Sequence, residues 1–487
     1  MAVGRRFHGD AWFGTHFCNR RVSRKSSDTS SPTATLARFA SDLRYADLPQ
    51  AVKDHLILLA LDAVGCCVQG AGLPWTLRVR EQVVIQGGRA ESKILGTPLR
   101  VPAPGAALVN ATAGHGFEMD DIHRDAIIHG GSLVFPAAMA LAEAEGVISG
   151  AEFLCAVAAG YEVGLRVGAA AGQGMLMAGF HPQGTSGAFA SAAAAARILR
   201  LNPAGTRHAL GIAGSLGAGL MASQQGAMVK RLHAGHAARA GVEAARLARC
   251  GFSGIEDVIE AEYGGFLSAH SPAPNPERLL SGLGERFEIL QVGIKPFATV
   301  TSIHTCLEAL NAIMVKHGLA HEEVAKIRAG VSRATHVHCA WPYRGQSLTA
   351  AQMNLFFGLA VMALYGDAGA LEFTEDRVND AEILKFIQRI EARVDHEIDA
   401  GGPAARHAAR VEVETRNGDR FERYVKDRLG SPEKPLSEER IRMKFRANAG
   451  AMGNEIAVDR VEELIGEIEE LEDVSVIADA CAATKKV

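Results

Sequence analysis

The sequence has few aromatic residues, no broad excess of charge of either sign and no long uninterrupted apolar run. Aromatic side chains make up only 6% of the 487 residues, and the 51 basic and 55 acidic residues are mixed along the chain. Without a basic surface interleaved with stacking rings, nucleic acid is not expected as a partner. Apolar stretches such as Leu56 to Val68 are interrupted by Asp62 and fall short of the roughly 20 residues that span a bilayer. No membrane anchor is predicted.

Cysteine is also sparse. The eight cysteines form no CxxC pair and no regular spacing, so neither a disulfide framework nor a zinc site is predicted. An iron–sulfur cluster usually requires closely spaced thiolates, and this pattern argues against one. A reducing cytoplasm and a protein without cofactors are the expectations.

The composition is that of a globular protein, with 48% hydrophobic and 22% charged residues. The chain exceeds the roughly 250–300 residues at which single cores stop growing, so at least two domains are expected. Residues 1–32 are basic and then serine-rich, which is typical of a disordered tail or of a transit peptide. We favour the tail, and we expect its deletion to leave activity and melting temperature unchanged.

Residues 33–286 predict a helical domain. They are rich in alanine and leucine at helical spacing, as in Pro49 to Val68 and Gly187 to Leu199, and are broken mainly by glycine and proline. The run SPAPNPE at 271–277 places three prolines in seven residues. Such a run cannot continue a helix and marks a long connection or a domain boundary.

Residues 287–432 have a different texture that predicts an α+β domain. Val324 to Val331 alternates apolar and polar residues, and Arg410 to Val425 contains two such runs around Asn417-Gly418, a dipeptide that suits a hairpin turn. Helical spacing returns at 349–364 and 380–396. The charged, helical segment 433–487 is expected to pack back on the first domain. The predicted fold class is mainly α.

The densest group of chemically active side chains lies in GHGFEMDDIHRDAIIHGGS, residues 114–132. It contains three histidines and four acidic residues: His115, Glu118, Asp120, Asp121, His123, Asp125 and His129. A carboxylate beside an imidazole holds one tautomer and raises its basicity, as a general base requires. A divalent metal site and a solvated loop are the alternatives.

Three further motifs carry candidate groups. In MVKRLHAGHAAR, five basic side chains gather where a long helix begins, including Lys230, Arg231 and His233. Cations oppose the dipole of a helix N-terminus, so an anionic ligand would explain them, with a solvated basic face as the alternative. His181 in FHP and His304 in KPFATVTSIH are weak signals when taken alone.

Taken together, the four motifs resemble those of the MmgE/PrpD family, and the resemblance covers nearly the whole chain after the tail. The motifs are EMDDIH with His129, FHP, MVKRLHAGHAAR, and KPF with His304. That family includes 2-methylcitrate dehydratase, cis-aconitate decarboxylase and iminodisuccinate epimerase. Within the family, the chain is most similar to the fungal cis-aconitate decarboxylase branch. This similarity lies in the segments GLMASQQGAMVKR, EYGGFL, THVHCAW, AAQMN and ERIRMKFRANAG. Ile122 departs from the pattern, because many relatives carry threonine there, and His233 stands where the fungal branch has glutamine.

The resemblance implies a homodimer with a large all-helical domain, a smaller α+β lid and an active site between them. It implies a metal-independent lyase acting on a citrate-like or aconitate-like polycarboxylate. The alternatives are an epimerase of an imino- or amino-dicarboxylate, a non-catalytic anion-binding protein and a metal-dependent hydratase. The implied catalytic residues are Asp120, His129, His181, Lys230 and His304, and the implied substrate-binding residues are Glu118, Asp121, His123, Arg231 and His233. His304 is expected to reach the substrate from the lid when the cleft closes, so that His304→Ala lowers turnover roughly 100-fold.

Overall fold

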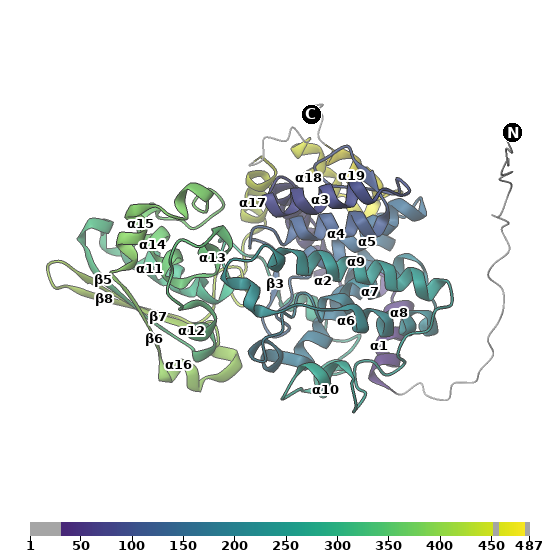
Figure 1. The fold of residues 1–487 in the computed structure, drawn as a ribbon, viewed down its shortest axis with the longest axis horizontal. Coiled ribbons are helices and arrows are strands. Elements are labelled where there is room, and N and C mark those ends of the chain that lie inside the picture. Colours follow the sequence, from purple (N-terminus) through teal and green to yellow (C-terminus); the bar gives the residue numbers. More distant parts are fainter. Residues whose placement is uncertain (1–30, 451–456, 483–487) are drawn as a thin grey trace, which may run out of the picture.

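The computed structural model describes residues 31–450 and 457–482. They form two domains, a large helical one and a smaller one built on a sheet, which lie side by side (Figure 1). The mainly α fold class is thereby confirmed. Nearly all of the tail predicted at 1–32 lies outside the described residues, although Ser31 caps the first helix by accepting the amide of Ala34.

The helical domain consists of helices from the first three-fifths of the chain and from its end, with two short β-pairs at its margins. The helices are α1 (Pro32–Asp42), α2 (Gln50–Gly70), α3 (Pro74–Gln86), α4 (Ala103–Gly114), α5 (Gly131–Glu145), α6 (Gly150–Met177), α7 (Gly187–Ile198), α8 (Pro203–Leu216), α9 (Val229–Arg249), α10 (Phe266–His270), α17 (Glu438–Gly450), α18 (Val458–Gly466) and α19 (Ser475–Ala480). The strand pairs are β1 (Ser92–Lys93) with β2 (Arg100–Val101), and β3 (Ile122–His123) with β4 (Val292–Gly293).

Small side chains allow the central helices to approach closely. A Cβ atom added to Gly164 of α6 would lie 2.3 Å from the Cβ of Ala190 in α7, so this crossing tolerates no side chain at residue 164. Helix α6 is long and apolar enough by length and composition to cross a membrane, but its apolar window is entirely buried inside the domain. Burial on all sides is typical of the central helix of a globular core.

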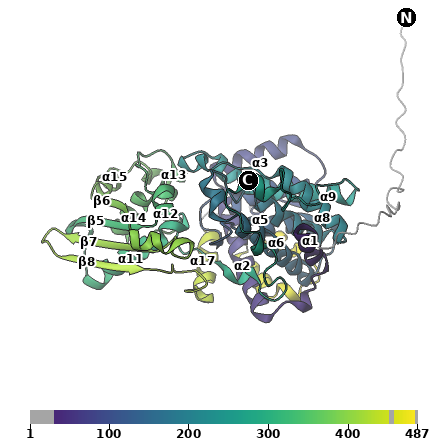
Figure 2. The same ribbon diagram turned by 90° about the horizontal axis from the view of Figure 1, so that it is seen from below.

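The smaller domain contains a four-stranded mixed sheet in the order β6-β5-β7-β8 (Figure 2). Its strands are β5 (Val324–Val331), β6 (Ile390–Val394), β7 (Ala409–Thr415) and β8 (Arg420–Val425), and its helices are α11 (His304–His317), α12 (Arg333–Cys339), α13 (Leu348–Met353), α14 (Leu355–Tyr365), α15 (Ala381–Ile387) and α16 (His396–Ala400). The predicted strand at 324–331 and the hairpin around Asn417-Gly418 are both confirmed.

Two helix predictions in this domain need correction. The segment 380–396 is helical only in its first half, because Ile390–Val394 forms strand β6, which pairs in parallel with β5. IEARV alternates apolar and polar residues, and the free edge of β5 supplies its backbone partners. The helix predicted at 349–364 is two helices, because the Asn354 side chain caps α14 by accepting the amides of Phe356 and Phe357.

The chain has two hydrophobic cores, one within the helical domain and one in the sheet domain that also takes in Cys66, Trp75, Phe117 and Met119 of the helical domain. Phe287, Ile289 and Ile294 pack in the helical core, whereas the core of the sheet domain includes Phe297. The change of core therefore falls near Lys295. After the sheet, the chain returns to the helical domain, where Phe445 of α17 packs against α2. In Figure 1, α17 lies on the side of the helical domain that faces the sheet domain.

Candidate active site

A cavity of about 50 Å³ lies between the two domains, and we call it the central cavity. Its wall comes from the loop before α5, from the start of α9, and from the sheet domain's α12 and neighbouring loops. The lining residues are Glu118, Ile122, Ile127, His129, Leu176, His181, Met221, Lys230, Val300, Thr301, Ser302, Ala334, His338, Met353, Arg406 and His407. Four of the predicted site residues are among them: Glu118, His129, His181 and Lys230.

Glu118 is the centre of a buried cluster of three cations. Its carboxylate accepts hydrogen bonds from Lys230 and Arg231 at the start of α9, and Lys295 Nζ lies 3.3 Å from its Oε2. Burial raises the pKa of Glu118, but the charges of Lys230, Lys295 and Arg231 outweigh it and hold the pKa well below its usual range. The cluster therefore keeps a net positive charge, as a site for a multiply charged anion requires.

The Glu118 cluster is held by a second layer of contacts. Arg231 donates to Gln352 Oε1 at 2.7 Å, and Gln352 in turn donates to the carbonyl of Phe117 at 2.8 Å. Glu118 itself adopts φ 58°, a left-handed conformation that is uncommon for residues other than glycine. A network that maintains such a conformation is typical of functional sites.

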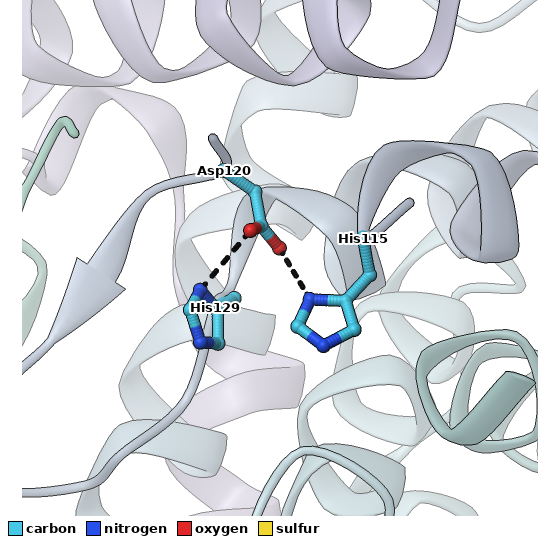
Figure 3. Close-up of side chains that lie close together, drawn as sticks. All are labelled: His115, Asp120 and His129. Atoms are coloured by element: carbon cyan, nitrogen blue, oxygen red, sulfur yellow. Dashed lines mark hydrogen bonds and ion pairs between the residues drawn. The ribbon is translucent and has the colours of Figure 1, made fainter. Parts of the chain in front are cut away.

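Asp120 lies between two histidines (Figure 3). Its carboxylate is 2.8 Å from Nδ1 of His115 and 3.2 Å from Nδ1 of His129, and it accepts the Ser132 hydroxyl at 2.8 Å. If both Nδ1 atoms carry the proton, each Nε2 keeps a lone pair. His129 lines the central cavity, so its Nε2 is available for proton transfer, with Asp120 stabilising the charged ring.

The local chain positions His129 on both sides. Gln183 accepts the His129 amide at 2.9 Å and donates to its carbonyl at 3.1 Å. A Cβ atom at Gly130 would lie 2.1 Å from the Tyr161 ring, so only glycine fits there. These contacts hold the imidazole on a rigid part of the helical domain.

His181 belongs to a second pair of imidazoles. Its Nδ1 is 2.8 Å from Nδ1 of His233, and its ring centroid is 5.9 Å from that of His115. Burial, together with the charge of Lys230, holds the pKa of His181 well below its usual range. His181 is therefore neutral at physiological pH and a weak base, so it is better suited to hydrogen bonding than to accepting a proton.

The sheet domain contributes three groups that sequence reasoning missed as site residues: His338, Arg406 and His407. His338 Nε2 is buried without a hydrogen-bond partner among the described residues, and burial lowers the pKa of this ring to about 4. Arg406 donates to the carbonyl of Arg124 at 2.9 Å but makes no ion pair with any described carboxylate. HVHC was visible as a histidine-rich run, but no sequence signal marked Arg406.

Two predicted substrate-binding residues, Asp121 and His123, lie away from the cavity wall. Asp121 accepts the amide of Gly131, at the start of α5, at 2.9 Å and the Tyr161 hydroxyl at 2.7 Å. Burial raises the pKa of Asp121 to about 8, so this carboxyl group is mostly neutral at physiological pH and occupies the helix N-terminus by hydrogen bonding. His123 Nε2 lies 3.3 Å from Glu288 and faces another cavity.

His304 does not line the central cavity. It is 1% exposed, its Nε2 lies 3.1 Å from the carbonyl of Thr299, and its ring packs on Phe297. Arg231 and His233 are likewise one layer behind the wall, where they hold Glu118 and His181.

A divalent metal fits this site poorly. His115, Asp120 and His129 offer ligand atoms within 4.8 Å of one another, as a metal site requires. However, Lys295 Nζ is 3.7 Å from Asp120 Oδ1, and the Asp120 carboxylate is already shared by both imidazoles and Ser132. An added cation would face the ammonium group of Lys295, so the residues present favour proton chemistry.

The chain belongs to the MmgE/PrpD family. The MmgE/PrpD N-terminal domain matches residues 34–279, and the MmgE/PrpD C-terminal domain matches residues 297–470. The chain is 30% identical to a cis-aconitate decarboxylase of Aspergillus terreus over 93% of its own length and 96% of the relative. It is 28% identical to cis-aconitate decarboxylase of Homo sapiens, over 91% and 93% of the two chains. The family predicted from the four motifs is confirmed.

Proposed function

We propose that this protein is a lyase that removes carbon dioxide from a cis-aconitate-like tricarboxylate without a metal. The observation that carries the proposal is the composition of the central cavity, where a carboxylate-backed histidine faces two cationic side chains. His129 with Asp120 supplies the proton-transfer group, and Lys230 and Arg406 supply positive charge. The names of the relatives support the substrate class.

Lys230 and Arg406 would hold two carboxylates of the substrate from opposite domains. Lys230 is anchored on the helical domain by Glu118, and Arg406 lies on the sheet domain beside His407. The guanidinium group of Arg406 can bind a carboxylate through two parallel hydrogen bonds. Charge held in place before the reaction stabilises the electrons that remain on the substrate when the carbon–carbon bond breaks.

His129 is our candidate for the proton transfer. When carbon dioxide leaves, its bonding electron pair stays on the substrate carbon, and a proton must be delivered to the resulting carbanion. The Asp120 carboxylate stabilises an imidazolium at His129, which can give that proton from Nε2 and later recover one. The neutral rings of His181 and His338 lie on the same wall and can hydrogen-bond the substrate.

Substrate entry requires the domains to separate. Ligand pockets usually measure about 300–1,000 Å³, whereas the central cavity holds about 50 Å³. The central cavity must therefore widen to admit a tricarboxylate, and we propose that the sheet domain moves as a lid to allow this. Closure would exclude water and bring Arg406 and His338 to the substrate.

A substrate screen tests the proposal directly. The protein would be incubated with cis-aconitate, 2-methylcitrate, citrate and iminodisuccinate in heavy water and followed by NMR. Deuterium in a decarboxylated product of cis-aconitate is the expected result, and His129→Asn should abolish it while the matched variant His336→Ala retains it. Hydration, dehydration or epimerisation without loss of carbon dioxide would overturn the carboxy-lyase assignment.

The alternatives give distinct outcomes in the same screen. An epimerase would exchange deuterium into an imino- or amino-dicarboxylate and invert its stereocentre. A non-catalytic binding protein would bind carboxylates through Lys230 and Arg406 but turn over none of them. The row of imidazoles argues against the second alternative, because holding an anion needs cations and does not need neutral histidines.

We also propose that the protein is a homodimer that forms through α3. Leu77, Val84 and Ile85 share one face of this helix and are 37%, 46% and 71% exposed. Exposed apolar residues grouped on one face mark interaction surfaces. Light scattering should give twice the chain mass, and Ile85→Asp should give a monomer; a monomeric wild-type protein would exclude the dimer.

A further inference from the structure

A second cavity of about 450 Å³ lies along the junction of the two domains, and we call it the seam cavity. Its helical-domain wall includes His123, Arg124, Arg278 and Arg286, and its sheet-domain wall includes His407 and Arg428. His407 lines both the seam cavity and the central cavity, so the two are neighbours. Nothing in the proposed reaction uses the seam cavity.

Most charges around the seam cavity are paired. Arg124 lies 3.1 Å from Glu433, Arg278 lies 3.2 Å from Asp125, and Arg286 lies 2.8 Å from Glu288. Lys426 and Asp427, which are neighbours in the sequence and opposite in charge, also line the cavity. The charges of these groups are balanced within the chain and need no ligand.

Arg428 is the exception. It is only 4% exposed, and its Nη1 atom is buried without a hydrogen-bond partner in the part of the chain that the structure describes. Within that same part, its guanidinium group makes no ion pair, although the other arginines of the wall do. A buried charge without a partner destabilises the fold, so an anionic ligand that pairs with Arg428 is a physical explanation for its presence.

We propose that the seam cavity binds a small oxyanion, a carboxylate or a phosphate group, with Arg428 as its principal ligand. Arginine presents a planar fork of donors that matches both kinds of oxyanion. The cavity is large enough for a di- or tricarboxylate or an inorganic phosphate. The oxyanion would give Arg428 a negatively charged partner, which the other arginines of the wall already have.

Binding there would favour domain closure. Arg428 belongs to the sheet domain, whereas Arg124, Arg278 and Arg286 belong to the helical domain, so an anion between them contacts both. A ligand that binds only the closed arrangement raises its population by mass action. The seam cavity would then be a regulatory site, distinct from the central cavity and independent of which reaction occurs there.

The test compares Arg428→Met with Arg423→Gln, an exposed arginine of the same domain without an ion pair among the described residues. Calorimetric titration with inorganic phosphate should show binding to the wild type and to Arg423→Gln, and an affinity loss of about 10-fold or more in Arg428→Met. Phosphate should raise the melting temperature of the first two proteins only.

Without phosphate, Arg428→Met should melt no lower than the wild type, because methionine removes a buried unpaired charge. This result separates a ligand-binding role from a structural one. A lower melting temperature together with unchanged phosphate affinity would overturn the proposal.

A second titration identifies the source of the oxyanion. Propane-1,2,3-tricarboxylate would be titrated into Lys230→Ala, in which the central cavity is impaired, with and without Arg428→Met. Binding that depends on Arg428 assigns a carboxylate ligand, and binding of phosphate alone assigns a phosphate ligand. If neither probe binds in an Arg428-dependent manner, the seam cavity is not an anion site.

Discussion

The cations of the helical domain and those of the sheet domain are buried to a similar degree, but only those of the helical domain are paired with a carboxylate. Lys230, Arg231 and Lys295 share the carboxylate of Glu118. Arg406 and Arg428 are 7% and 4% exposed and form no ion pair with a described residue. Burial lowers the pKa of both arginines to about 10.

This difference indicates how the work of anion binding is divided. A cation held by a carboxylate and a glutamine is fixed before the substrate arrives, so little reorganisation is needed during the reaction. A buried cation without a carboxylate is stabilised only when an anion reaches it. The helical domain thus supplies a preformed site, and the sheet domain gains most from closing on a ligand.

The largest expected effect comes from breaking the paired cluster. Glu118→Gln leaves Lys230, Arg231 and Lys295 without their shared carboxylate, and removing one partner of a buried ion pair costs about 3–5 kcal/mol. Urea unfolding should show this loss in the free energy of unfolding. Arg406→Met is the control, since it should cost far less; equal losses would mean that the two domains do not differ in the way described.

The next effect separates two histidines of the sheet domain. His338 lines the central cavity and His304 does not, so His338→Ala should lower kcat by roughly 10²-fold with little change in stability. His304→Ala should act mainly on stability, because its ring is packed on Phe297. Steady-state kinetics and thermal melts of both variants decide the matter, and a larger loss of kcat in His304→Ala would return the catalytic role to that residue.

Removing the unpaired cation of the central cavity should affect substrate capture. In Arg406→Met a substrate carboxylate loses a charge-assisted hydrogen bond worth about 1.5–3 kcal/mol, so KM should rise by roughly 10-fold or more. The melting temperature should not fall. A lower melting temperature with an unchanged KM would show that Arg406 serves the fold and does not bind the substrate.

The pH dependence should follow Lys230. Burial lowers its pKa to about 8, against the raising effect of Glu118. Lys230 is charged below that pH and neutral above it, so kcat/KM should fall by about 10-fold for each pH unit above roughly 8. Arg406→Met should retain this limb of the profile, because Arg406 remains charged throughout the range. A flat profile to pH 9.5 would place the essential cation elsewhere.

The smallest expected effect is that of a chelator. If Asp120 is occupied by His115, His129 and Ser132, dialysis against EDTA should leave kcat/KM within about 2-fold of its starting value, because no metal polarises the substrate. Added Zn²⁺ or Mg²⁺ should not stimulate. Loss of activity that the metal restores would instead favour the metal-dependent hydratase.

Local patterns in the sequence were sufficient for much of the fold. Alternation at 324–331 and the Asn417-Gly418 turn indicated β5 and the β7–β8 hairpin, because period-two patterns and turn residues act over a few neighbouring positions. The same reasoning failed at Ile390–Val394, where a parallel partner far along the chain decided between helix and strand. The order of four motifs was specific enough to indicate the family.

The sequence by itself also determined which chemical groups are present: the histidines, the carboxylates near residue 120 and the basic start of α9. Only the tertiary structure decided which of them meet. It placed His129, His181 and Lys230 on one wall, moved His304 and Asp121 behind it, and brought Arg406 and His338 to it from the sheet domain. The reason is physical, because burial and pairing depend on neighbours hundreds of residues away, and no local pattern encodes whether a cation will find a carboxylate.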